Sequence, residues 1–193
     1  PEMVIIKCRD TTGRGWVVMT DDIYYSGTPY ANVHLRLDTT AATSAALYVG
    51  SVAPDSTHFY VGDDAIVNET DKDYIAYCFH SVDGYSKVGS YTGNGVADGT
   101  FVFTGFRPAY VMVKESVVGT GNGGWAIFDN KRSENNVADD SLYADTSGAE
   151  SVNNSYQMMD ILSNGFKLRS PSTASQINYT TSYIYIAFAE TPF

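Results

Sequence analysis

The sequence predicts an all-β protein: a β-sandwich of the jelly-roll or concanavalin-like kind, built from two homologous halves. Its composition and an internal repeat of apolar segments carry this prediction. Charged residues are only 18% of the 193, whereas 15 tyrosines and 17 glycines are present. This mixture favours strands and tight turns over surface helices. Only residues 39–47 and 155–162 are candidates for short helices.

The chain repeats its strand-like segments at a nearly constant offset. Residues 1–7 (PEMVIIK) recur at residues 108–114 (PAYVMVK), 107 positions later, and each copy leads to an apolar run that begins at Trp16 or Trp125. At offsets of 107 or 109, three further pairs correspond: residues 35–40 with 142–147, 59–61 with 166–168, and 74–79 with 183–188. No histidine and no pair of carboxylates recurs, so the repeat indicates a scaffold rather than a duplicated site.

The spacing of these segments predicts three parts: a first repeat at residues 1–83, a connecting strand pair at 84–106 and a second repeat at 107–193. Because no Pro-rich linker separates the repeats, we expect them to pack as one sandwich domain; two small sandwiches in tandem are the alternative. Nothing like the connecting pair precedes Pro1. The first repeat therefore needs a substitute from upstream sequence or a neighbouring subunit, unless both repeats share one sandwich. A start at Pro1, directly at a repeat, predicts a fragment of a longer polypeptide.

Charge and hydropathy exclude two kinds of partner. The formal net charge of -10 opposes nucleic-acid binding, which depends on Lys and Arg releasing counterions from phosphates. No apolar run approaches the roughly 20 residues needed to span a bilayer, so we expect no membrane insertion. The two cysteines, Cys8 and Cys78, are expected as buried free thiols, with a single bridge as the alternative.

The sequence lacks the common catalytic and metal-binding motifs. His34, His58 and His80 stand apart, and no H-E-x-x-H, C-x-x-C or G-x-S-x-G motif occurs. We therefore predict no enzyme activity, no metal site and no cofactor. The Asp-Asp pairs at residues 63–64 and 139–140 lack the spacing of an EF-hand. The sequence does not decide whether a structural calcium ion is bound.

Aromatic residues give the remaining signal. Tyrosines among Asn, Ser, Gly and Thr are typical of surfaces that pack on a ligand and hydrogen-bond its hydroxyl groups. Trp16 and Trp125 occupy equivalent repeat positions, so we expect them in the core. The candidate ligand-binding residues belong to one copy only or to the connecting segment: Tyr24, Tyr25, Tyr30, Tyr85, Tyr91 and Asn94. Ordinary sheet packing is the competing interpretation for them.

Four segments carry a resemblance to a known family: residues 89–95 (GSYTGNG), 104–114 (TGFRPAYVMVK), 163–168 (SNGFKL) and 183–193 (YIYIAFAETPF). They resemble a repeated domain of structural proteins in marine and environmental tailed bacteriophages. Such domains often close tail-fibre or tail-associated proteins and accompany lectin-like, laminin-G-like β-sandwich modules. The resemblance covers almost the whole chain, and residues 24–30 depart from it. It implies a virion surface location and no catalysis, and it assigns no ligand residues.

The resulting expectation is a non-catalytic surface module of a phage tail or capsid appendage that binds host cell-surface glycan. Its partners would be host polysaccharide, other virion proteins and copies of itself, as a trimer by analogy with fibres. Several weak sites would then act together through multivalency. One alternative is a structural decoration or assembly module without host contact. Another is a glycan depolymerase, which would hold two carboxylates across a cleft.

Overall fold

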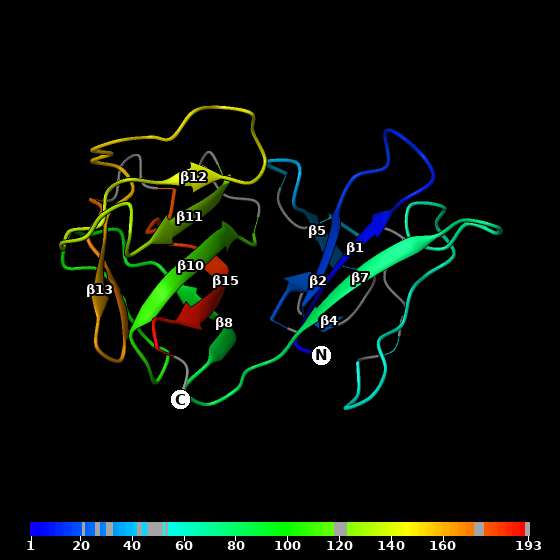
Figure 1. Ribbon diagram of the computed structural model, residues 1–193, viewed down its shortest axis with the longest axis horizontal. Coiled ribbons are helices and arrows are strands. Elements are labelled where there is room, and N and C mark those ends of the chain that lie inside the picture. The colour runs from blue at the N-terminus through cyan, green and yellow to red at the C-terminus, as the bar shows by residue number, and fades with distance from the viewer. Residues whose placement is uncertain are drawn as a thin grey trace. The chain divides into compact units, whose positions relative to one another are not determined.

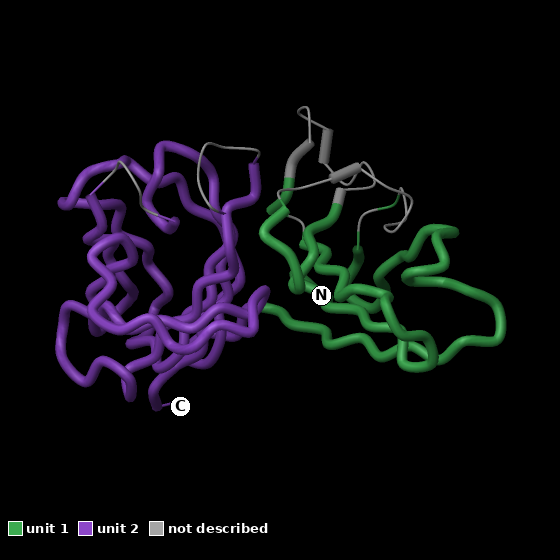
Figure 2. Tube along the Cα trace, turned by 90° about the horizontal axis from the view of Figure 1, so that it is seen from above, with its two compact units in different colours: residues 1–80 green, residues 81–193 purple. Residues whose placement is uncertain are grey.

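The computed structural model describes residues 1–20, 22–25, 28–29, 33–41, 44–45, 52, 54–117, 123–171 and 176–191. In these residues the chain forms antiparallel strands, turns and loops, with no helix, so the all-β sandwich prediction is confirmed. The chain divides into two compact units, Pro1–His80 and Ser81–Phe193 (Figure 2). Each unit has its own hydrophobic core. Packing of the two repeats as one domain stays a prediction.

The first unit is a five-stranded sheet in the order β6-β5-β2-β1-β7 (Figure 1). Its strands are β1 (Met3–Cys8), β2 (Val17–Thr20), β5 (Val33–Arg36), β6 (Ser44–Ala45) and β7 (Tyr74–Phe79). A short ribbon pairs β3 (Tyr24–Tyr25) with β4 (Thr28–Pro29). On one face of the sheet, Val4, Ile6 and Val17 pack with Ile66 and Val67. A loop, rather than a second sheet, thus supplies part of this core.

The second unit is a sandwich of a five-stranded sheet, β12-β11-β10-β15-β8, and a three-stranded sheet, β13-β14-β9. The strands of the larger sheet are β8 (Ser86–Thr92), β10 (Pro108–Glu115), β11 (Trp125–Asp129), β12 (Leu142–Tyr143) and β15 (Ser182–Ala189). Those of the smaller sheet are β9 (Phe101–Phe103), β13 (Met159–Leu162) and β14 (Gly165–Leu168). Both sheets contribute to one core, which includes Val111, Phe128 and Tyr183 from the larger sheet and Val102, Phe166 and Leu168 from the smaller.

Alternation along the strands explains which side chains enter this core. In β10, Val111 and Val113 belong to the core between the sheets, and Met112 and Lys114 take the opposite face because successive side chains of a strand point to opposite sides. In β9 only Val102 points inward, with an exposed phenylalanine on either side of it.

The two units share a register that follows the sequence repeat. Val4 pairs with Cys78 between β1 and β7, and Val111 pairs with Ala187 between β10 and β15. The order β5-β2-β1-β7 thus matches β12-β11-β10-β15. This match supports a duplicated sheet. The units differ beyond it, since the predicted connecting pair supplies β8 and β9 to the second unit, each in a different sheet.

Neither predicted helix is present in the described residues. Residues 155–162 form turns followed by strand β13, whose Met159 and Ile161 enter the core with the period of a strand. Residues 39–47 contain β6 in their described part. Both helix predictions are therefore wrong. Both cysteines are free thiols, as expected, but burial is found for Cys8 alone: Cys78 is exposed, so the expectation of a buried thiol was wrong there.

We expect Phe166→Ala to lower the free energy of unfolding by about 3–5 kcal/mol, because the ring is fully buried and leaves a cavity. Its ring meets Tyr91 and Tyr185 edge to face. The exposed Phe103→Ala is the control, with a change within about 0.5 kcal/mol. Urea unfolding followed by fluorescence measures both. Equal losses in the two variants would contradict this assignment of the core.

Candidate functional site

Tyr91, one of the predicted ligand residues, lies in the core. Its hydroxyl donates a hydrogen bond to the Ile177 carbonyl at 2.8 Å, and its ring stacks on Tyr183 with centroids 4.9 Å apart. Burial raises its pKa well above the ordinary tyrosine value. The prediction of Tyr91 as a ligand residue is corrected: the side chain is on the inward face of β8, where it fills the space between the two sheets.

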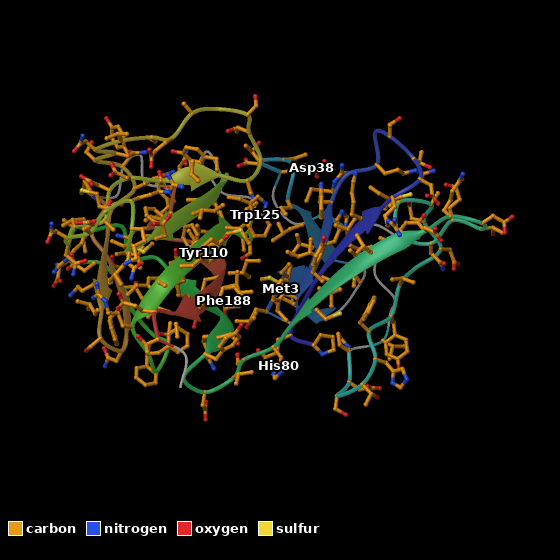
Figure 3. All side chains as sticks on the ribbon, in the orientation of Figure 1. Met3, Asp38, His80, Tyr110, Trp125 and Phe188 are labelled. Atoms are coloured by element: carbon orange, nitrogen blue, oxygen red, sulfur yellow. The ribbon has the colours of Figure 1, made fainter. Side chains whose placement is uncertain are left out.

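Tyr85 and Asn94 are at the surface and already have intramolecular contacts. The Tyr85 ring meets Phe188 edge to face at 6.1 Å, and Phe188 also contacts Tyr110 on β10 (Figure 3). Asn94 Nδ2 donates to the Asp98 carbonyl at 3.0 Å, and Asn94 Oδ1 accepts from the Val96 amide at 3.2 Å. Asn94 therefore closes the turn after β8, as expected for an Asn-Gly turn.

The remaining candidates belong to the first unit. Tyr24 and Tyr25 form β3 and pair with β4, and their side chains lie outside the described part of the structure. Tyr30 lies outside the described residues altogether. The described candidates thus occupy a core position, a turn and an aromatic contact, and their contacts do not join them into one cluster.

A different surface has the character of a binding site: the outer face of the three-stranded sheet. Phe101 and Phe103 on β9 are 43% and 63% exposed, whereas Val102 between them is buried. Both rings therefore stand on the same side of the sheet, two residues apart. Large exposed apolar side chains that gather at one place mark interaction sites more often than single ones do.

Glycine shapes the backbone beneath these rings. A Cβ atom at Gly165 on β14 would lie 2.1 Å from the Val102 carbonyl oxygen and 3.2 Å from the Phe101 ring. Only glycine therefore allows β14 to pass this close to β9, and the Phe101 ring lies beside bare backbone. Gly105, with a φ of 87°, has the Phe103 ring near the place of its missing Cβ. The backbone beside the two rings thus carries no side chain at Gly165 or Gly105.

Charged side chains border the phenylalanines. Lys167, which pairs with Phe101 in register, contacts Asp98 at 2.5 Å, and Arg169 contacts Asp160 at 2.6 Å and Asp98 at 3.7 Å. The Lys167 ammonium lowers the pKa of Asp98 by its hydrogen bond and its charge. Such pairs at the surface add little stability, but they hold donors and acceptors in place around the rings. The β9–β14 face is the name we give to six residues: Phe101, Phe103, Lys167, Arg169, Asp98 and Asp160.

The β9–β14 face suits binding rather than acid–base catalysis. Lys167 and Arg169 hold the pKa of Asp98 below its ordinary value, so Asp98 stays ionised, unlike the general acid of a glycosidase. Within the described residues, no group of three or more His, Cys, Asp or Glu side chains could hold a metal ion. The described residues also contain no helix able to cross a membrane.

One comparison with known proteins gives a result for the whole chain. A family model described as a domain of unknown function, DUF7483, matches residues 1–192. The chain belongs to the DUF7483 family. No curated protein and no solved structure matches it.

This DUF7483 chain also contains a duplicated contact around its two tryptophans. The Trp16 amide donates to Asp38 Oδ1 at 3.1 Å, and the Trp125 amide donates to Asp145 Oδ1 at the same distance. In each case the aspartate follows the strand that pairs with β2 or β11, namely β5 or β12, and holds it against the start of β2 or β11. Equal geometry at both copies indicates a structural clamp rather than a ligand site.

A lysine completes each clamp from the neighbouring strand. Lys7 Nζ donates to the Arg14 carbonyl and Lys114 Nζ to the Gly123 carbonyl. The two copies differ in burial: Lys114 and Trp125 are fully buried, whereas the partly exposed Trp16 has Lys7 Nζ 5.8 Å from its ring centroid. The expectation of a core tryptophan thus holds for Trp125 more fully than for Trp16.

Burial lowers the pKa of Lys114 to about 8 from 10.5, against the opposing charges of Asp145 and Glu115. Between these two values the unfolded chain binds a proton that the folded chain does not, so stability rises with pH. We expect the wild type to gain on the order of 2 kcal/mol relative to Lys114→Met between about pH 8 and 10.

Urea unfolding of both proteins is measured across this pH range, and the quantity compared is the difference between their free energies of unfolding at each pH. It stops at pH 10 because the pKa of Tyr110 is raised by burial from 10.0 to about 12, so tyrosine ionisation in the unfolded chain then lowers stability. A difference that is constant with pH would show that Lys114 remains charged in the folded protein.

Proposed function

We propose that the chain is a non-catalytic, glycan-binding module of a bacteriophage virion surface, and that the β9–β14 face is its ligand surface. The exposed pair Phe101 and Phe103 on one side of β9 carries this proposal. The ligand surface is then a sheet face, in place of the tyrosine-bearing loops that the sequence favoured.

The chemistry of the face matches that of a sugar. A pyranose ring has a flat patch of C–H groups that can stack on an aromatic ring, and hydroxyl groups around its rim. The Phe101 and Phe103 rings supply apolar area without a hydroxyl of their own, and burying that area is favourable at about 25 cal/mol per Å². Lys167, Arg169 and Asp98 supply donors and acceptors at the border, already oriented by their ion pairs.

The virion location rests on the resemblance to repeated domains of tailed-phage surface proteins. Two of the resembling segments frame the face in sequence: residues 89–95 run from β8 into the Asn94 turn, and residues 104–114 lead into β10. The formal net charge of -10 supports an extracellular glycan over a nucleic acid as the ligand class. Immunogold labelling of purified particles tests the location, and label absent from intact particles would contradict it.

For the ligand, we expect Phe101→Ala and Phe103→Ala each to weaken glycan binding about tenfold, because losing one stacked ring removes roughly 1.4 kcal/mol. A microbial glycan array identifies the ligand, and titration calorimetry measures the affinities. Tyr156→Ala is the matched control, since Tyr156 is an exposed aromatic residue outside the face.

Two results would overturn the glycan proposal. One is wild-type affinity in both phenylalanine variants for any glycan that the protein binds. The other is binding to bacterial cells that persists after periodate oxidation of their glycans but is lost after protease treatment, because the face would then recognise a protein.

A further inference from the structure

Strand β7 has an apolar sequence and an exposed position. Ile75 and Tyr77 are 37% and 43% exposed, whereas their counterparts on β15, Ile184 and Ile186, are 0% and 2% exposed. The counterparts are defined by register as well as by sequence: Lys7 pairs with Ile75 as Lys114 pairs with Ile184. Two strands that correspond in sequence and in register thus have opposite environments.

The two strands also differ in their neighbours. β15 lies between β10 and β8 and pairs with β8 from Ser182↔Thr92 to Phe188↔Ser86. β7 pairs with β1 and ends its sheet (Figure 1). Within the described part of the chain, the other edge of β7 has no partner strand. No described strand of the first unit takes the place that β8 has in the second.

Nothing in β7 protects this edge against pairing. Edge strands of monomeric proteins usually carry a lysine, a proline, a bulge or an inward charge. The sequence of β7 is YIAYCF, without charge or proline, and its register with β1 is regular. Its Tyr77 ring is also held in place, since it stacks on Trp16 with centroids 6.3 Å apart. An exposed, straight and apolar edge of this kind is a template for another strand.

We propose that β7 pairs antiparallel with β7 of a second copy of this chain, joining two five-stranded sheets across a twofold axis. An uncharged strand is complementary to itself in this arrangement, because no like charges face each other. One interface satisfies the open edge of both copies and closes the assembly. This dimer differs from the trimer expected by analogy with fibres, and it is independent of glycan binding by the β9–β14 face.

The register shows which backbone groups take part. The Arg9 amide donates to the Asp73 carbonyl at 2.9 Å, and amide directions alternate along an antiparallel strand. The amides of Ile75 and Tyr77 therefore point toward β1, and that of Ala76 points to the open edge. Ala76→Pro removes a donor needed by the second copy and leaves the bonds to β1 in place.

Sedimentation equilibrium on the whole chain tests the proposal with two variants of β7. The wild type is expected to sediment as a dimer, and Ala76→Pro and Tyr77→Glu as monomers of half that mass. Glutamate at position 77 repels its copy across the twofold axis, and the residue directly opposite it on β1 is the uncharged Ile5. Phe103→Glu is the matched control, with the same new charge on another exposed edge strand, and it should remain dimeric.

Cys78 gives a second measurement, because its exposed thiol lies on β7 whereas Cys8 is buried. Alkylation of Cys78 should slow as protein concentration rises in the wild type and stay constant in Tyr77→Glu. A wild type that is monomeric at every concentration overturns the proposal, as does a dimer that survives both β7 variants. Glycan affinity per site should be unchanged in Tyr77→Glu, so this proposal and the glycan proposal fail separately.

Discussion

Antiparallel pairing of β15 with β10 on one side and β8 on the other is the constraint on which the second unit depends. Residues Tyr183–Ala187 are buried on both faces of the strand, and a strand covered in this way has a continuous apolar sequence rather than an alternating one. Fixing β8 also fixes the chain that follows it, through the Asn94 turn to β9. Because Val102 closes the sandwich there, the two phenylalanines beside it face outward.

Much of this order could be predicted from the sequence, since equal spacing of strand segments implies equal registers. The offset relates Val4 and Cys78 to Val111 and Ala187, which pair in the same way. The prediction of a short helix was wrong for residues 155–162, where Met159 and Ile161 alternate as a strand. The prediction of Tyr91 as a ligand residue was wrong because a tyrosine hydroxyl can find a hydrogen-bond partner inside a core, here the Ile177 carbonyl.

The β9–β14 face was missed for a physical reason. Alternation shows that Phe101 and Phe103 share one side of a strand, but it does not show which side faces the core, and a shift of one residue exchanges the two sides. Hydrophobicity alone favours placing both phenylalanines inside. The core has no room for them because Phe166 and Leu168 on β14 already fill the space against Tyr91 and Tyr185. That competition depends on strands distant in sequence.

The two units show how one strand pattern serves two kinds of surface. The exposed edge of β7 offers backbone groups and uncharged side chains, which suits strand addition, where main-chain hydrogen bonds supply the affinity. The β9–β14 face offers rings bordered by Lys167, Arg169 and Asp98, which suits recognition by side chains. If the first unit assembles and the second binds, a dimer carries two ligand faces, and linked weak sites gain avidity without any new contact. The sequence presented assembly and glycan recognition as alternative functions. In such a dimer the two functions are complementary.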